Sequence, residues 1–210
     1  MKREGVLIVL SGFSGAGKGT IVKRLMSQYD NYALSISMTT RAPREGEVDG
    51  REYFFSTKED FEKKIRENGL IEYACYCGNY YGTPKDYVRK MLAEGKDVIL
   101  EIELQGAMKV KEQFPQALLL FVMPPSADVL KERLTGRGTE TEEVIANRLA
   151  RASEESEGIE QYDYIVVNDD LDTCVERVHQ IIDCSHDAAD RNQIFIEDMR
   201  KQLQMFAKNQ

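Results

Sequence analysis

The feature that most constrains the fold of this sequence is a glycine-rich segment directly after an apolar run near the N-terminus. Residues 7–10 read Leu-Ile-Val-Leu, and residues 11–20 read Ser-Gly-Phe-Ser-Gly-Ala-Gly-Lys-Gly-Thr. Gly12, Gly17 and Lys18 stand at the phosphate-loop spacing G-x-x-x-x-G-K. In such a loop, backbone N–H groups surround phosphate oxygens at a helix N-terminus, and the lysine reaches the outer phosphates. A glycine-rich turn that binds nothing is the alternative, but strand, loop and helix follow here in the required order.

The residue after the lysine departs from the usual form of this motif, which has Ser or Thr there. This chain has Gly19 at that position, and the hydroxyl comes one residue later at Thr20. The form G-K-G-T resembles the loop of kinases that phosphorylate nucleoside monophosphates. We therefore expect Thr20 to lie near Mg²⁺, partly through water, and the whole loop to bind ATP through Gly12, Phe13, Ser14, Gly15, Ala16, Gly17, Lys18, Gly19 and Thr20.

Length, charge and cysteine content narrow the class of protein. A chain of 210 residues forms one domain, with small insertions at most. Its net charge of −8 argues against a nucleic-acid partner, which normally requires a basic surface. The four cysteines lack C-x-x-C spacing, so reduced thiols are expected rather than a metal site or disulfides. We find no apolar stretch suited to a signal peptide or a membrane span, and we expect a cytoplasmic protein without membrane contact.

Strand and helix patterns alternate over most of the chain, which predicts an α/β fold. Such alternation implies a three-layer core, in which helices cover both faces of a parallel sheet. We assign residues 1–32 and 96–185 to this phosphate-loop core. Strands are expected at 97–101, 117–123 and 164–167, and helices at 18–29, 105–113, 126–134, 142–155 and from 171 onward.

Residues 33–95 differ from the core because they contain several short strand patterns close together. We predict an inserted antiparallel α+β arm, with strands at 33–38, 52–55, 70–77 and 80–83 around a turn at Gly78-Asn79. Helices are expected from a capping box at 56–59 and over 84–94. In the extension 186–210, Phe195, Met199, Leu203 and Phe206 nearly repeat every four residues. This predicts either an amphipathic helix that packs on the body or a partner, or a mobile polar terminus.

Two groups of basic residues could handle phosphate. Arg41 and Arg44 lie in a polar loop, and Tyr53 and Tyr81 follow; guanidinium and phenol donors suit a dianionic phosphate. Alone, such arginines are usually surface charge and such tyrosines usually packing, but their combination with a phosphate loop favours a site. The second group lies around a glycine-flanked loop and a charged helix, where Arg151 could instead pair with Glu155; it comprises Arg133, Arg137, Arg148 and Arg151.

With these residues, the sequence closely resembles guanylate kinase. The resemblance spans about residues 5–185 in the family's order, so it is far more specific than a phosphate loop alone. The motifs that carry it are Ser-Ile-Ser-Met-Thr-Thr-Arg-Ala-Pro-Arg-Glu-Gly-Glu at 35–47, the segments 50–55 and 78–83, Gln105-Gly106, Pro124-Pro125-Ser126, Gly136-Arg137-Gly138 and Val-Asn-Asp-Asp at 167–170.

The resemblance implies roles for individual residues. The GMP phosphate would be held by Arg41, Arg44, Tyr53 and Tyr81, and the guanine by Ser37, Glu72 and Thr83. Asn168 would lie beside the adenine of ATP. Residues 135–157 would form a helical lid, and the catalytic residues would be Lys18, Arg41, Arg137 and Arg148. Glu101 and Glu103 stand where the family commonly has aspartates, and they are expected near Mg²⁺ or the guanine, on the same side of a strand if the strand extends that far.

The chemistry of guanine supports the role given to Glu72. The Watson–Crick edge of guanine presents N1–H and N2–H as adjacent donors, and one carboxylate can accept both. Adenine has no donor at N1 and would leave the carboxylate unpaired, which can cost ~10⁴-fold in selectivity. Without the resemblance, a solvent-facing strand residue would be the simpler interpretation of Glu72.

The sequence therefore predicts a guanylate kinase that transfers the γ-phosphoryl group of ATP to GMP, and to dGMP, in purine nucleotide metabolism and GMP recycling. ATP is the co-substrate and Mg²⁺ the cofactor, and the protein is expected to be a monomer or a homodimer. An interaction module that has lost catalysis is one alternative, although such modules typically lose the loop lysine and the GMP-site residues retained here. A kinase for a different nucleoside monophosphate is the other.

Overall fold

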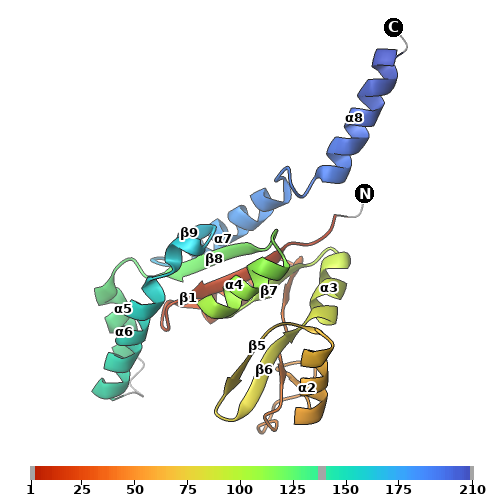
Figure 1. Ribbon diagram of the computed structural model, residues 1–210. Helices are drawn as coiled ribbons and strands as arrows, with labels where there is room; N and C mark the ends of the chain where they lie inside the picture. The colour runs from red at the N-terminus through yellow and green to blue at the C-terminus, as the bar shows by residue number, and fades with distance from the viewer. Residues whose placement is uncertain (1–2, 137–140, 209–210) are drawn as a thin grey trace.

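The computed structural model describes residues 3–136 and 141–208. Its centre is a five-stranded sheet in the order β2-β7-β1-β8-β9, with every neighbouring pair parallel (Figure 1). The central strands are continuous apolar runs because helices cover both faces of the sheet. The predicted α/β core is confirmed. The strands are β1 (Leu7–Gly12), β2 (Tyr32–Leu34), β7 (Asp97–Leu100), β8 (Leu118–Met123) and β9 (Tyr164–Val167).

The helices of the core begin and end close to the predicted positions. Three of them have side-chain caps of the expected type: Ser126 Oγ accepts from Val129 N at 3.2 Å, Thr141 Oγ1 from Val144 N at 3.4 Å, and Asp170 Oδ1 from Thr173 N at 2.9 Å. These elements are α1 (Lys18–Gln28), α3 (Lys85–Ala93), α4 (Leu104–Gln113), α5 (Ala127–Thr135), α6 (Glu142–Ser156), the 3₁₀ turn η1 (Ile159–Gln161) and α7 (Leu171–His186).

The arm is a separate four-stranded sheet in the order β4-β3-β6-β5. It is mixed rather than antiparallel as predicted, because β3 and β4 run parallel. The hairpin turn lies at Cys77-Gly78, one residue earlier than expected, and both residues have positive φ. The N-cap of the first arm helix is Thr57, which accepts from Asp60 N, so the predicted capping box is shifted by one residue. The elements are β3 (Met38–Thr39), β4 (Phe54–Phe55), α2 (Lys58–Arg66), β5 (Leu70–Tyr76) and β6 (Asn79–Pro84).

The arm is shorter than the predicted range 33–95. The single strand expected at 33–38 is two strands in two sheets: β2 pairs with β7 in the core, and β3 pairs with β6 in the arm. At the other end, α3 packs its buried Val88 and Leu92 into the core. Both ends of the predicted arm therefore belong to the core. The local sequence pattern does not specify the pairing and packing partners that decide this.

The C-terminal extension forms a helix, α8 (Gln193–Lys208), that extends away from the body (Figure 1). The extension is therefore helical, but packing on the body is not seen, because six large apolar side chains of α8 remain 43–72% exposed. No helix within the described ranges is long and apolar enough to cross a membrane. The exposed side chains are Ile194, Phe195, Met199, Leu203, Met205 and Phe206.

Candidate active site

The phosphate loop joins β1 to α1 through three glycines with positive φ: Gly12, Gly15 and Gly17, at 151°, 93° and 94°. This backbone conformation is one that residues with a Cβ rarely adopt. At Gly12 a Cβ would also lie 2.2 Å from the carbonyl oxygen of Val122. The loop therefore depends on glycine both for its dihedral angles and for its close approach to β8. α1 begins directly after it, so the N–H groups of its first turn face the loop.

Lys18 folds back over the loop that precedes it. Its Nζ donates to the carbonyl oxygens of Gly12 at 2.6 Å and Phe13 at 3.2 Å. Burial lowers the pKa of Lys18, and the negative charge of Glu101 is the largest opposing influence. The ammonium group is thus held at the loop by neutral acceptors, with carboxylates in its surroundings.

Asn168 lies against the same loop. Its buried side-chain Nδ2 donates to the carbonyl oxygen of Ala16 at 2.8 Å. Its backbone carbonyl oxygen accepts from Arg133 Nη2 at 2.9 Å. A Cβ on Gly17 would come within 2.5 Å of this amide. Asn168 therefore supports the loop directly, a contact that the sequence did not indicate.

Glu101 and Glu103 lie after the end of β7 rather than on it. The strand ends at Leu100, so strand alternation does not align Glu101 with Glu103. The Glu101 carboxylate oxygens lie 3.8 and 3.9 Å from the position of a Cβ on Gly19, beside the loop. Glu103 instead pairs with Arg151 Nη2 at 2.6 Å, across to α6. No group of three or more His, Cys, Asp or Glu within the described ranges could hold a metal ion.

Helix α6, part of the predicted lid, reaches the loop through Arg148, whose Nη1 lies 3.5 Å from Ser14 Oγ. Arg151 forms the predicted pair with Glu155, at 3.2 Å, in addition to its contact with Glu103. The other predicted lid residue, Arg137, lies outside the described residues. The structure thus brings one of the two predicted lid arginines to the phosphate loop.

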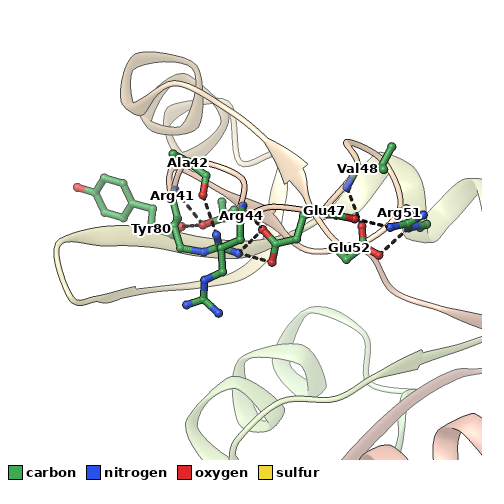
Figure 2. Close-up of polar contacts among 10 residues, drawn as sticks. Arg41, Ala42, Arg44, Glu47, Val48, Arg51, Glu52 and Tyr80 are labelled. Atoms are coloured by element: carbon green, nitrogen blue, oxygen red, sulfur yellow. Dashed lines mark hydrogen bonds and ion pairs between the residues drawn. The ribbon is translucent and has the colours of Figure 1, made fainter.

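On the arm, Arg41 and the two predicted tyrosines lie together. The Arg41 guanidinium is 5.4 Å from the centre of the Tyr53 ring, and the Tyr53 and Tyr81 rings meet edge to face at 6.0 Å. Arg41 Nη1 also donates to the carbonyl oxygen of Ala42 at 2.7 Å. Three of the four predicted phosphate-binding residues, Arg41, Tyr53 and Tyr81, therefore lie together. Arg44 lies in the same loop as Arg41 (Figure 2).

Glu47 is a residue of this loop to which the sequence gave no role. Its two carboxylate oxygens each lie 2.9 Å from Arg41 Nη2, and Oε2 also accepts from the backbone N of Arg44 at 2.7 Å (Figure 2). The hydrogen bond from Arg41 lowers the pKa of Glu47, and the same bond raises the pKa of Arg41. The available signal was a group of carboxylates directly after Arg41 and Arg44, at Glu45, Glu47 and Asp49. Opposite charges so close in a loop tend to pair, but the sequence alone does not select Glu47.

The predicted guanine-binding residues lie on adjacent strands of the arm. The buried hydroxyl of Thr83 donates to Glu72 Oε1 at 2.8 Å, from β6 to β5. Ser37 precedes Met38, which pairs with Gly82, so Ser37 lies opposite Thr83 in the antiparallel register. Burial raises the pKa of Glu72, while the Thr83 hydrogen bond and the charge of Lys109 oppose the rise. Glu72 is therefore not the solvent-facing residue of the simpler interpretation.

A parallel sheet that ends in a phosphate loop, a helix that brings an arginine to this loop, and an arm with its own convergent polar residues define a P-loop kinase of nucleoside monophosphates. The family model of guanylate kinase matches residues 4–185. The chain therefore belongs to the guanylate kinase family, and it is an enzyme of the nucleoside monophosphate kinase class.

Relatives support this assignment over nearly the whole chain. The chain is 52% identical to the guanylate kinase of Bacillus anthracis over 202 residues, which cover 96% of this chain and 98% of the relative. It is 51% identical to the guanylate kinase of Bacillus subtilis (strain 168) over 187 residues, 89% and 92% of the two chains. The crystal structure of guanylate kinase from Anaplasma phagocytophilum matches with a TM-score of 0.69 at 32% identity and covers 91% of each chain. The predicted family and fold are confirmed.

Proposed function

We propose that this chain transfers the γ-phosphoryl group of ATP, bound at the phosphate loop, to GMP bound by the arm, giving ADP and GDP. The observation that carries the proposal is the hydrogen-bonded pair of Glu72 and Thr83, which presents a partly buried carboxylate in the arm of a nucleotide kinase. Each carboxylate oxygen has two lone pairs, so Oε1, which accepts from Thr83, and Oε2 can together receive the adjacent N1–H and N2–H donors of guanine. Adenine would leave this acceptor unpaired. Ser37, opposite Thr83, completes the proposed guanine contacts.

In this proposal the GMP phosphate binds Arg41, Arg44, Tyr53 and Tyr81. Guanidinium and phenol groups donate in fixed directions, so they suit phosphate oxygens. Glu47 positions Arg41 and the backbone of Arg44 before substrate arrives. Because every proposed contact is to the base or the phosphate, dGMP is a second acceptor.

This reaction depends more on the alignment of the two substrates and the neutralisation of their charge than on a general base. The attacking oxygen of the GMP phosphate is already anionic, so it forms the new bond to the γ-phosphorus as the bond to the β–γ bridging oxygen breaks. Lys18 would exchange its carbonyl acceptors in the loop for phosphate oxygens, and Arg148, with Arg137 outside the described residues, would neutralise the transferring group. One such arginine can contribute ~10³–10⁵ in rate. Closure of the arm and of the lid, residues 135–157, would exclude water.

Mg²⁺ fits the residues beside the loop. Thr20 supplies a hydroxyl in the first turn of α1, and Glu101 supplies a carboxylate near Gly19. Mg²⁺ prefers such oxygen donors and usually keeps several waters in addition to substrate phosphates, so a small protein contribution is sufficient. Thr20 and Glu101 would hold the ion partly through water, and the ion would supply positive charge at the β- and γ-phosphates. Glu103, paired with Arg151, is better placed to orient α6.

The proposed setting is the cytoplasm, in purine nucleotide metabolism and GMP recycling, with the chain as a monomer or a homodimer. Free thiols at Cys75, Cys77, Cys174 and Cys184 suit a reducing compartment. The net charge of −8 supports a protein without a nucleic-acid partner.

The replacement Lys18→Ala tests the proposed reaction. ADP formation with ATP and GMP should fall by at least ~10³-fold, because the loop loses the charge that faces the outer phosphates. The melting temperature should stay near that of wild type. Lys23→Ala removes an exposed lysine from the same helix and serves as the matched control. Turnover near normal in Lys18→Ala would refute the role of the loop.

A further inference from the structure

Glu72 lies at a junction between the arm and the core. Strand β5, which carries Glu72, contacts helix α4 of the core, and Gln113 Nε2 of α4 donates to the carbonyl oxygen of Ile71 at 2.6 Å. A cavity of about 220 Å³ opens between them, and its lining includes Glu72, Tyr73, Lys109 and Gln113. The strand that carries the carboxylate proposed to bind guanine is therefore held partly by the core.

Among the residues that line this cavity, Glu72 and Lys109 of α4 are the two that carry a charge. Lys109 is exposed, and its Nζ lies 5.8 Å from the centre of the ring of Tyr73, the neighbour of Glu72 on β5. The other lining side chains are uncharged, as is Thr83 of β6, which donates to Glu72; they are Ile65, Asn68, Leu70, Ile71, Tyr73 and Gln113. Burial raises the pKa of Glu72, and Lys109 and the Thr83 hydroxyl oppose that rise.

We propose that Lys109 is a positioning residue for guanine recognition, whose ammonium group keeps the partly buried Glu72 carboxylate ionised so that it can accept both guanine donors. This inference rests on the proposed contact between Glu72 and guanine. A protonated Glu72 carries an O–H in place of one acceptor, so it cannot receive N1–H and N2–H together. Lys109 acts through Glu72, from the core side of the junction, and needs no contact with GMP.

The test compares the pH dependence of kcat/KM for GMP in wild type, Lys109→Gln and Lys109→Arg. In Lys109→Gln the midpoint of the acid limb should move up by about half to one pH unit, which gives ~3–10-fold lower kcat/KM below the midpoint. The curves should converge near pH 8.5, where Glu72 is ionised in both. KM for ATP should not change, and Lys109→Arg, which keeps the charge, should restore the wild-type profile.

A matched control removes one lysine charge elsewhere. Lys90→Gln, on the exposed side of α3, should leave the midpoint unchanged. The GMP phosphate itself titrates near pH 6, but it does so equally with every variant, so the difference between the curves belongs to the protein. Titration of the Glu72 carboxyl by ¹³C NMR, without nucleotide, should show the same upward shift in Lys109→Gln.

Glu72→Gln distinguishes a failure of the proposed guanine contact from a failure of the proposed role of Lys109. If Glu72→Gln lowers kcat/KM for GMP and Lys109→Gln shifts the midpoint, both roles are supported. If Glu72→Gln lowers activity but the midpoints of wild type and Lys109→Gln coincide, the role of Lys109 is overturned and the guanine contact stands. If Glu72→Gln leaves kcat/KM for GMP unchanged, the guanine contact itself fails, and the inference fails with it.

Discussion

The two carboxylates that define the arm have opposite surroundings. Glu47 accepts hydrogen bonds from Arg41 and from the backbone of Arg44, which lower its pKa and keep it charged. Glu72 is partly buried, which raises its pKa, and the Thr83 hydroxyl and the charge of Lys109 only partly oppose this rise. The first carboxylate therefore serves to hold cations in place. The second is an acceptor whose charge is costly until a ligand with two donors arrives.

This difference predicts that Glu72→Gln stabilises the folded protein. A carboxyl group whose pKa is raised on folding binds protons more tightly in the folded state, so its contribution to stability falls as the pH rises from its ordinary value through the raised one. The replacement removes this loss and keeps an oxygen for the Thr83 hydroxyl. The melting temperature of Glu72→Gln should therefore exceed that of wild type at pH 8, with a smaller difference at pH 4. A lower melting temperature at pH 8 would show that the charge is stabilising.

Glu47→Gln should weaken GMP binding specifically. The amide keeps one acceptor but loses the charge that holds Arg41, so we expect KM for GMP to rise ~3–10-fold with KM for ATP unchanged, in line with the loss of one charge-assisted hydrogen bond. Steady-state kinetics measure both constants.

Glu52→Gln provides the matched control for this prediction. Glu52 lies in the same loop and accepts from Val48 N at 2.8 Å and from Arg51 Nε at 2.6 Å, away from Arg41. An equal rise in KM for GMP in both variants would mean that Glu47 merely stabilises the loop.

At the scale of elements, local pattern predicted the strands and helices of the core well, since apolar runs, caps and the glycine loop are encoded within a few residues. Local pattern did not predict structure correctly where the pairing partner of a strand determines the sheet to which the strand belongs. Residues 33–38 read as one strand, yet β2 joins the core sheet and β3 joins the arm. Likewise, the pairing of Arg151 with Glu103 joins residues 48 positions apart, and charge alone does not choose Glu103 over other acids. The motif residues of the site were predicted because family motifs specify them, whereas Glu47 and Lys109 depend on three-dimensional contacts.

Replacement of Gly12, at the junction of β1 and the phosphate loop, should destabilise the fold more than replacement of a glycine in an exposed turn. Gly12→Ala introduces both an unfavourable φ and a clash with the Val122 carbonyl oxygen at 2.2 Å. Gly78→Ala, at a φ of 76° in open space, introduces only the first. Urea denaturation should show a loss of about 1 kcal/mol for Gly78→Ala and about 3 kcal/mol or more for Gly12→Ala. Equal losses would contradict the close packing of the loop on β8.

At the scale of the whole molecule, the catalytic body and α8 are distinct. The family model ends at residue 185, near the end of α7, but the match to Bacillus anthracis guanylate kinase covers 202 of the 210 residues and so extends beyond it. Helix α8 leaves its apolar side chains exposed, and the root of the extension contacts the body at Gln116, through Asp190 and Arg191. The active site is built without α8.

Removal of residues 193–210 should therefore have little effect on catalysis. We expect kcat/KM for GMP to stay within about twofold of wild type and the melting temperature to stay within about 2 °C, because a helix with few buried contacts adds little to global stability. A large loss of either would mean that α8 supports the body through contacts absent from this structure.

We expect the partly buried carboxylate of Glu72 to select guanine. The most direct test is the ratio of kcat/KM for GMP to kcat/KM for AMP in one coupled assay, measured for wild type and Glu72→Gln. The same assay also measures dGMP and UMP as acceptors. Wild type should prefer GMP by ~10⁴-fold, and Glu72→Gln should lose at least ~10² of that ratio, mainly through weaker use of GMP. A preference of wild type for AMP, or a ratio unchanged by Glu72→Gln, would contradict the account.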